Sequence, residues 1–262
     1  MVSIILPCYN AQSTIQDTLN SILNQTYQNF ELICINDGSK DNTLDILNNY
    51  YKNSQITMKI ISRENKGFLK SLDEGIRISS GEFIARIDSD DIWKPDHLEK
   101  IIDEFNTNNK LVLCGSNAEY IDINNNIIGV SNQPTNIIKY LMKDSPYIHS
   151  SVVFKSSIYI KTSGYLIGDD EGSKHIADYN LWLELSKFGE CINLRDQTLK
   201  YRILDNSMSR TINRCVNYKS RLLVMKKTYK FYKKFHFFYF FNYIKVSIRI
   251  MQNCFLNKVF ND

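Results

Sequence analysis

Three carboxylates stand within four residues where one apolar run ends. They belong to the segment RIDSDD, residues 86–91, which overlaps the apolar run Phe83–Ile87. Carboxylates this close repel one another unless solvent or a cation screens them, and their hard oxygens suit Mg²⁺ or Mn²⁺. The segment is therefore expected either to face water or to bind a divalent metal. It is not an EF-hand loop, because Ile92 and Trp93 stand where that loop needs an oxygen ligand and a glycine.

A second acidic turn follows another apolar run, Phe30–Ile35. Its residues suit a strand-to-helix turn, in which Gly38 is permissive and Ser39 or Asp41 caps the next helix. They also suit a ligand site, because open α/β sheets bind ligands at the carboxyl ends of their strands and Asp37 stands at such an end. Taken alone, the turn favours the first interpretation.

Three common nucleotide-binding or nucleophile motifs are absent from the sequence, namely GxGxxG, GxxxxGK[ST] and GxSxG. Phosphate groups, if they are bound, must then be held by a metal. A divalent ion on the Asp-x-Asp element at residues 88–90 would hold a diphosphate and neutralise the charge that develops as it leaves.

The apolar pattern predicts the elements that must position these residues. Four short runs have the composition of strands buried on both faces, and apolar residues recur at helical spacing between them. The strands are Val2–Leu6, Phe30–Ile35, Met58–Ile61 and Phe83–Ile87, and helices are expected around residues 15–23, 44–51 and 68–76. This alternation predicts an α/β fold with a largely parallel sheet, right-handed crossovers and helices on both faces.

The pattern after Asp91 is mixed and less regular. It predicts a helix over residues 94–105 with Pro95 in its first turn, and a later helix over residues 177–188 that Gly189 ends. Short strands are expected between these helices at Leu111–Cys114, Tyr120–Ile123 and Ile127–Val130, the last two forming a hairpin.

Length and composition indicate one enzyme-sized unit with an appendage. The chain has 262 residues, 43% of them apolar, which is enough for one sizeable core but not for two. Six widely spaced cysteines form no CxxC pair, which favours free thiols in a reducing compartment over disulfides or a zinc site. The first ten residues lack the charged start of a signal peptide, and no window reaches the roughly 18–20 apolar residues that span a bilayer. Export is therefore not expected.

Charge divides the chain at about residue 205. Residues 206–262 hold twelve basic residues and one acidic residue, a net charge of +11. Residues 1–205 hold 20 basic and 27 acidic residues, a net charge of −7. Over residues 219–249 basic residues are interleaved with phenylalanines, a composition typical of a helix in a membrane interface. A terminal helix packed on the body or on a second copy is the alternative. Nucleic acid is not expected as a partner, because the acidic body would repel it.

Several motifs, taken together and in order, resemble a known family. They are VSIILPCYN, INDGS, RENKG and RIDSDD, residues 2–10, 35–39, 63–67 and 86–91. Their order and spacing resemble the family 2 glycosyltransferases, whose GT-A fold is an α/β, mostly parallel sheet flanked by helices. The resemblance is unbroken over residues 1–105, which it implies are a nucleotide-sugar-binding half, and continues in patches to about residue 209. Residues 106–205 would form the acceptor half, and residues 206–262 a basic, aromatic helical extension.

The resemblance gives the acidic turns a role in binding the donor. It implies that Asp37 contacts the base of the sugar nucleotide, that Asp88 lies near the ribose or sugar, and that Asp90, with Asp91, holds Mn²⁺ or Mg²⁺. The nucleotide-sugar set that it implies is Pro7, Tyr9, Asp37, Arg63, Asn65, Lys66, Asp88 and Ser89. Each of these residues alone also suits a strand end, a core wall or a solvated loop, but the ordered set favours the functional interpretation.

The second half supplies a candidate catalytic base. The segment HIADYNLWLEL, residues 175–185, resembles a helix start in the family whose aspartate, here Asp178, removes the proton from the acceptor hydroxyl. An acidic residue in a first helical turn also suits the helix dipole by itself. Ala177 replaces a residue that is usually polar in the family, and Leu204 replaces a histidine that commonly lies near the metal. The candidates for the acceptor or diphosphate region are His149, Ser207 and Ser209.

The resemblance implies an inverting transferase that moves a hexosyl or N-acetylhexosaminyl group from a nucleoside diphosphate sugar, UDP by default, to a glycan or lipid-linked acceptor. Such an enzyme would serve bacterial cell-surface polysaccharide synthesis, in the cytoplasm at the inner face of the membrane. Two alternatives stay open. One is a sugar-nucleotide pyrophosphorylase, although its glycine-rich first loop is missing. The other is a nucleotide-binding or membrane-docking module without catalysis, which Ala177 and Leu204 would suit.

Overall fold

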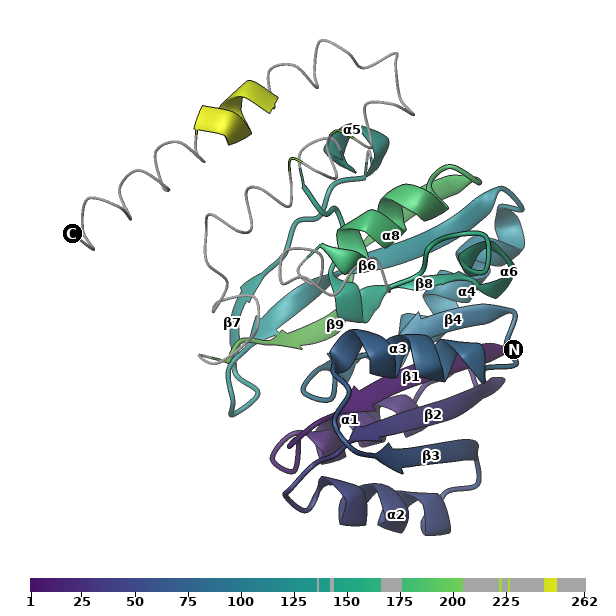
Figure 1. Cartoon of the computed structure of the whole chain (residues 1–262), viewed down its shortest axis with the longest axis vertical. Coiled ribbons are helices and arrows are strands. Elements are labelled where there is room, and N and C mark those ends of the chain that lie inside the picture. The colour runs from purple at the N-terminus through teal and green to yellow at the C-terminus, as the bar shows by residue number, and fades with distance from the viewer. Residues whose placement is uncertain are drawn as a thin grey trace, which may run out of the picture.

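One sheet forms the centre of the molecule. The computed structural model in Figure 1 describes residues 1–135, 137–141, 144–165 and 176–204, together with 222, 226 and 243–248. The strands are β1 (Val2–Cys8), β2 (Phe30–Asp37), β3 (Thr57–Arg63), β4 (Phe83–Arg86), β5 (Ile92–Trp93), β6 (Leu111–Ile121), β7 (Ile127–Val130), β8 (Val153–Lys155) and β9 (Glu190–Arg202). They form a nine-stranded sheet in the order β3-β2-β1-β4-β8-β6-β9-β5, with β7 paired to β6.

The amino-terminal strands confirm the predicted parallel sheet. β1 pairs in parallel with β2 and with β4, and β2 pairs in parallel with β3. In the other half β6 and β9 are parallel. The remaining pairs are antiparallel: β8 pairs with β4 and with β6, β5 pairs with β9, and β7 pairs with β6. The parallel pairs have the longer registers, so parallel pairing dominates the sheet.

The second half departs from the predicted strands. One strand, β6, replaces the two expected at Leu111–Cys114 and Tyr120–Ile123, because the polar residues between them are buried in the sheet. Ser116 is 0% exposed and Asn117 is 4% exposed. Strands β5, β8 and β9 are additional to the prediction. The predicted hairpin is confirmed as the pairing of β6 with β7.

Helices cover both faces of the sheet, as predicted (Figure 1). They are α1 (Ile15–Leu23), α2 (Thr43–Asn53), α3 (Phe68–Arg77), α4 (His97–Thr107), α5 (Ile137–Leu141), α6 (Ser156–Tyr159) and α8 (Ala177–Leu185). Leu19, Leu47 and Ile101 bring α1, α2 and α4 into one apolar core. Leu72 and Trp182 bring α3 and α8 into a second core. The sheet is therefore buried on both sides.

Two helix boundaries differ from the prediction. α4 begins at His97, beyond Pro95, whose carbonyl instead accepts a hydrogen bond from the Thr26 N–H at 2.8 Å. α8 ends at Leu185, and Phe188, which was expected on its packed face, is 45% exposed. The chain there closes in a tighter turn, because the Phe188 N–H donates to the Leu185 carbonyl at 3.0 Å.

The four cysteines that the structure describes are free thiols. Cys8, Cys34 and Cys114 are buried and Cys191 is half-buried. Burial raises the pKa of the Cys8 thiol well above its ordinary value, which makes that thiol unreactive. Cys215 and Cys254 lie outside the described residues.

The predicted tail, residues 206–262, lies mostly outside the described residues, as do Ser207 and Ser209. Within the expected membrane-contacting segment, 219–249, the structure describes residues 222, 226 and 243–248, and all of these are helical. In the part of the chain that the structure describes, no helix has the length and apolar character needed to cross a membrane.

Candidate active site

A hollow of about 910 Å³ opens at the carboxyl ends of β1, β2 and β4. It gathers most of the side chains that the sequence suggested for donor binding and catalysis. These are Pro7, Tyr9, Asp37, Asn65, Asp88, Ser89, Asp90, His149 and Asp178. Leu204, the residue in place of the expected histidine, also lines it, whereas Arg63, Lys66 and Asp91 do not.

Asp37 ends β2 and holds the loop that follows β3. Its Oδ1 accepts a hydrogen bond from the backbone N–H of Lys66 at 2.8 Å, and its Oδ2 accepts one from Gly67 at 2.9 Å. The guanidinium of Arg63 also donates to Oδ1. Arg63 and Lys66 are thus brought to Asp37, and they contact the carboxylate from outside the wall of the hollow.

The turn after β2 forms the strand-to-helix connection that the sequence favoured, and Asp37 at its start also lines the hollow. Gly38 has a φ of +75°, and a Cβ there would lie 2.7 Å from the backbone nitrogen of Asn65, so the turn needs glycine. Asp41 accepts a hydrogen bond from the Thr43 N–H at 3.0 Å, at the start of α2. The same turn therefore begins a helix and contributes a wall to the hollow.

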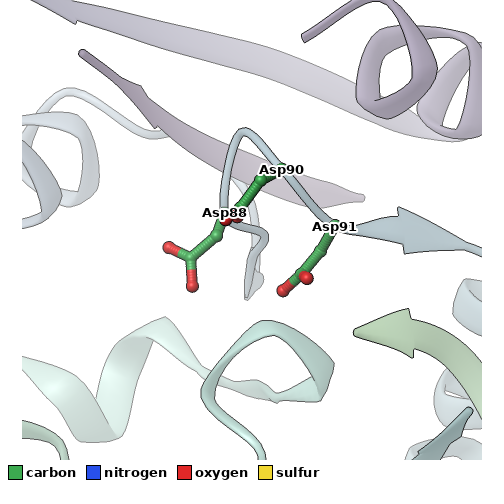
Figure 2. A group of neighbouring side chains, drawn as sticks. All are labelled: Asp88, Asp90 and Asp91. Atoms are coloured by element: carbon green, nitrogen blue, oxygen red, sulfur yellow. The ribbon is translucent and has the colours of Figure 1, made fainter. Parts of the chain in front are cut away.

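The three carboxylates after β4 lie close together. Figure 2 shows Asp88, Asp90 and Asp91 on one short loop, and one ligand oxygen of each lies within 4.8 Å of the others. Among the described residues, no other group of three or more histidine, cysteine or acidic side chains is arranged in this way. Such spacing allows one divalent cation to contact all three.

Asp88 is held in place by residues beneath it. The guanidinium of Arg86, which is fully buried, donates to both carboxylate oxygens, with an Nη1 to Oδ2 distance of 3.1 Å. The Ser150 hydroxyl donates to Oδ2 at 3.1 Å. Arg86 also lies 5.3 Å from the centre of the Phe68 ring. The orientation of Asp88 is therefore fixed before any ligand arrives.

The negative charges of Asp90 and Asp91 are offset less well by their surroundings than that of Asp88. Asp91 Oδ1 accepts a hydrogen bond from the Arg202 N–H at 2.9 Å, but its Oδ2 is buried without a hydrogen-bond partner in the described structure. Burial and the neighbouring carboxylates raise the pKa of Asp91 well above its ordinary value. Burial, and then Asp88, raise the pKa of Asp90 to about 6. An all-oxygen donor set with one unpartnered buried oxygen fits Mg²⁺ or Mn²⁺, whose charge would favour the ionised form of both groups.

Asp178 lines the same hollow from the first turn of α8. Its Oδ1 accepts a hydrogen bond from the Tyr179 N–H at 2.7 Å, and burial raises its pKa to about 6. A carboxylate with this pKa is ionised at neutral pH and is a stronger base than an exposed aspartate. The neighbouring Ala177, which stands where a polar residue was expected, is fully buried in the core. This replacement leaves the carboxylate of Asp178 in the hollow.

His149 lines the hollow as well, among aromatic rings. Its Nε2 lies 2.8 Å from the Tyr165 hydroxyl, and its ring makes edge contacts with Phe68 and Trp182. Burial, and then the charge of Arg86, lower the pKa of His149 well below its ordinary value. The imidazole is therefore neutral, which suits contact with an uncharged ligand.

Two buried arginines were not predicted as site residues. Arg86 orients Asp88, and Arg202 donates to the carbonyls of Asp90 at 2.8 Å and Asp122 at 2.9 Å. Arg202 thereby joins the acidic loop to the β6–β7 hairpin. The sequence held a signal for each: Arg86 is a charge inside an apolar strand, and Arg202 stands two residues before Leu204, where the resemblance implied a histidine.

Comparison with known families gives one extended match. The model of the family described as glycosyl transferase family 2 matches residues 3–163. The matched region contains β1 to β4, the acidic loop and β6, and ends before α8.

Relatives match this chain over most of its length. An uncharacterized glycosyltransferase of Haemophilus influenzae is 30% identical over 272 residues, which cover 100% of this chain and 80% of that protein. The UDP-Glc:alpha-D-GlcNAc-diphosphoundecaprenol beta-1,3-glucosyltransferase WfgD of Escherichia coli is 35% identical over 214 residues, which cover 80% of this chain and 79% of WfgD. The chondroitin synthase of Escherichia coli is 30% identical over 189 residues, but this match spans 27% of that longer protein.

Solved structures share the fold at low sequence identity. TarS of S. aureus, in complex with UDP-GlcNAc, superposes with a TM-score of 0.66 at 17% identity, over 85% of this chain and 65% of that one. The mannosyltransferase PcManGT of Pyrobaculum calidifontis, in complex with GDP-Man and Mn²⁺, has a TM-score of 0.66 at 16% identity. The match covers 87% of this chain and 64% of PcManGT. The fold is the GT-A fold that the sequence resemblance implied.

Proposed function

We propose a donor, an acceptor and a mechanism from one premise: the chain belongs to glycosyl transferase family 2. It is accordingly a glycosyltransferase, and its homologues include enzymes of bacterial polysaccharide synthesis. We infer that it moves a hexosyl or N-acetylhexosaminyl group from a nucleoside diphosphate sugar to a hydroxyl of a glycan or lipid-linked acceptor. The configuration at the anomeric carbon would invert.

One observation carries this proposal: two residues of the acidic triplet and a separate carboxylate line the same hollow from different elements. Asp88 and Asp90 belong to the loop after β4, with Asp91 behind them, while Asp178 belongs to α8. A sugar nucleotide held by the triplet would leave its anomeric carbon facing the rest of the hollow, where an acceptor hydroxyl and Asp178 could meet it.

The nucleotide would lie over the ends of β1 and β2. Pro7 and Tyr9 would flank the base, and Asp37 would contact it, with Arg63 and Lys66 supporting that carboxylate. Tyr9 is 52% exposed at the mouth of the hollow, so its ring is free to stack on a flat base.

The diphosphate and the sugar would lie at the acidic loop. Asp90 and Asp91 would hold Mn²⁺ or Mg²⁺, which when bound would offset the negative charge of the departing nucleoside diphosphate. Asp88, already oriented by Arg86, would accept hydrogen bonds from the ribose or the transferred sugar. Ser89 would line the same part of the hollow.

The acceptor would enter from the side of α8. Asp178, ionised at neutral pH, would take the proton of the acceptor hydroxyl while that oxygen attacks the anomeric carbon opposite the leaving diphosphate. A single displacement of this kind inverts the configuration. His149, kept neutral by burial, would contact the acceptor without attracting a charge.

UDP is the proposed nucleotide and a lipid-linked glycan the proposed acceptor. Two names support this choice: WfgD uses UDP-Glc and a diphosphoundecaprenol acceptor, and TarS was solved with UDP-GlcNAc. A lipid-linked acceptor is held in a membrane, so the transfer reaction must take place at the membrane surface. We therefore propose a peripheral position on the cytoplasmic face of the cell membrane, through residues 219–249.

Release of nucleoside diphosphate tests this proposal. The protein would be given UDP-Glc, UDP-GlcNAc, UDP-Gal and GDP-Man in turn, each with Mn²⁺, with Mg²⁺ and with a chelator. We expect one UDP-sugar to be hydrolysed slowly in a metal-dependent way, and the same donor to raise the melting temperature of the protein when metal is present. Asp178→Asn serves as the control that keeps donor binding and loses turnover.

Each alternative predicts a different result. A sugar-nucleotide pyrophosphorylase would release pyrophosphate from a nucleoside triphosphate and a sugar phosphate. A binding module would show the thermal shift without any release of nucleoside diphosphate, from the wild type as from Asp178→Asn. Either result would overturn the proposed function.

A further inference from the structure

A second hollow, of about 710 Å³, lies outside the active site. It shares no lining residue with the first hollow, and its walls come from β6, from the last residue of β7, from residues 131–135, from α5 and from β9. Of the residues that line it, only Arg195 carries a charge. The other polar members are mostly amides and hydroxyls. The hollow therefore differs from an anion site, in which several cations converge.

The floor of this hollow is built around one buried side chain. Asn117 Oδ1 accepts hydrogen bonds from the Ser131 hydroxyl at 3.0 Å and from the Gln133 N–H at 2.6 Å. Its Nδ2 donates to the carbonyls of Leu194 at 3.1 Å and Arg195 at 3.2 Å. The same residue lies at a register shift between β6 and β9. Asn117 thus fixes the loop on one side of the hollow and the bulged strand on the other.

The side chains above this floor are not bonded to any other described side chain or backbone group. Within the described residues, the side chains of Asn132, Gln133, Tyr140, Arg195 and Gln197 make no hydrogen bond or ion pair. The adjacent acid, Asp196, has its carboxylate 3.6 Å from the Lys100 ammonium, so Arg195 is not neutralised by its neighbour. A fixed floor that carries unpaired amide, phenol and guanidinium groups is typical of a site for a hydroxyl-rich ligand.

The second hollow lies next to the active site on its acceptor side. Asn193 Nδ2 donates to the carbonyl of Pro134, which lines the second hollow, at 3.1 Å, and to that of Pro146 at 2.8 Å. The residue after Pro146, Tyr147, lines the active site. β6 also runs from one hollow to the other, because Asn117 lines the second and Tyr120 the first, about 10 Å farther along the strand at the usual rise per residue.

We propose that the second hollow binds the acceptor glycan at sugar units remote from the hydroxyl that is attacked. The amides of Gln133 and Gln197 and the fork of Arg195 would hydrogen-bond to sugar hydroxyls, and the ring of Tyr140 would pack on a sugar face. The proposal rests on the proposed function, since it assumes that the acceptor is a glycan. It assigns to this chain a preference for acceptors longer than one sugar.

Binding and turnover with acceptors of two lengths test the proposal on the full chain. The probes are glucose and N-acetylglucosamine, each as the monomer and as a β-linked hexamer. Arg195→Ala and Gln197→Ala should raise the KM for a hexamer about tenfold, which corresponds to about 1.4 kcal/mol. The KM for the monomer and the rate of donor hydrolysis without acceptor should not change. Lys52→Ala is the matched control, because it removes an exposed positive charge on α2, at the other end of the sheet.

The two proposals fail in different ways. Equal KM values for monomer and hexamer in the wild type, or equal effects of the variants on both, would overturn the acceptor subsite while leaving donor chemistry intact. Absence of turnover with every donor would overturn the proposed function. In that case saturation-transfer NMR would test whether the second hollow binds a hexamer. The wild type should transfer saturation to the hexamer, and Gln197→Ala should not.

Discussion

At Asp178, the proposed base, burial raises the pKa of the carboxyl group and lowers the stability of the fold at neutral pH. Its pKa in the folded protein is about 6, above the ordinary value of 3.8. The folded state therefore binds a proton at Asp178 more tightly than the unfolded state does, and stability falls as pH rises from about 4 to about 6. Above that range the carboxylate is ionised and able to accept a proton, but its desolvation destabilises the folded protein.

Asp178→Asn should therefore lower turnover and raise stability together. We expect turnover to fall by about 10²- to 10⁴-fold, and the melting temperature at pH 7 to rise while that at pH 4 does not change. In the wild type, kcat should decline below a pH of about 6. Thermal melts and a pH series of nucleoside diphosphate release measure both effects. A variant that lost stability at pH 7 would contradict the stated origin of the pKa.

Asp88 and Asp90 stand two residues apart and should respond differently to alanine. Asp88→Ala leaves the fully buried Arg86 without its carboxylate, which should destabilise the protein by about 3 kcal/mol in addition to abolishing turnover. Asp90→Ala removes a carboxylate whose charge burial already disfavours, so stability in chelator should be kept while metal-dependent release is lost. Urea unfolding in EDTA separates the two. Equal losses of stability would contradict the pairing of Arg86 with Asp88.

At the residue scale, the sequence identified the groups that could do chemistry but not those that position them. Asp37, Asp88 and Asp90 were singled out as acids directly after apolar runs, and Asp178 through the family resemblance of its helix start. Arg202 was not predicted as a site residue, because its side chain contacts the carbonyl of Asp90, which is 112 residues earlier in the chain. Contacts at that separation depend on strand pairing that the sequence pattern did not indicate.

At the scale of elements, α3 packs on the sheet through a glycine. A Cβ at Gly75 would lie 2.7 Å from Ile5 Cγ2 on β1, closer than side-chain carbons approach. Gly75→Val should therefore push α3 away from β1 and destabilise the protein by about 2 kcal/mol. Lys70→Val, which adds the same side chain at an exposed position of α3, should change stability by less than about 0.7 kcal/mol. Urea unfolding of both variants measures the difference, and similar values would show that valine in the helix, rather than close packing, is the cause.

The first half of the sheet was predictable from the apolar pattern, and the second half only in part. β1 to β4 are short apolar runs bounded by polar turns, so each was recognised. β9 escaped recognition because its exposure alternates poorly along Glu190–Arg202, where register shifts interrupt its pairing with β6. β5 has two residues, Ile92 and Trp93, which is too short for any periodicity.

At the scale of the whole molecule, the charge on residues 206–262 leads to a prediction about location. Each basic residue near an anionic leaflet contributes about 1 kcal/mol, and the acidic body is screened beyond about 8 Å, so the tail should dominate. We expect the full chain to co-sediment with liposomes that contain anionic lipid, and to be released as salt is raised. A chain that ends at Asn206 should stay in the supernatant and keep donor hydrolysis. Equal sedimentation of the two chains would make the tail a packing or dimerisation element.

The contacts of Arg202 with the acidic loop join residues that are more than 100 positions apart in the chain. A newly made chain can therefore complete the acidic loop only after residue 202 has been synthesised. β1 to β4 can pair once residues 2–86 have left the ribosome, yet the loop that carries Asp91 waits for a partner 111 residues later. At about 5–20 residues per second, this delay is roughly 5–20 s. During this interval the acidic loop is expected not to be joined to β9. Brief protease treatment of stalled ribosome complexes should cut near residues 88–91 until residue 202 has emerged, and protection before that length would contradict this order.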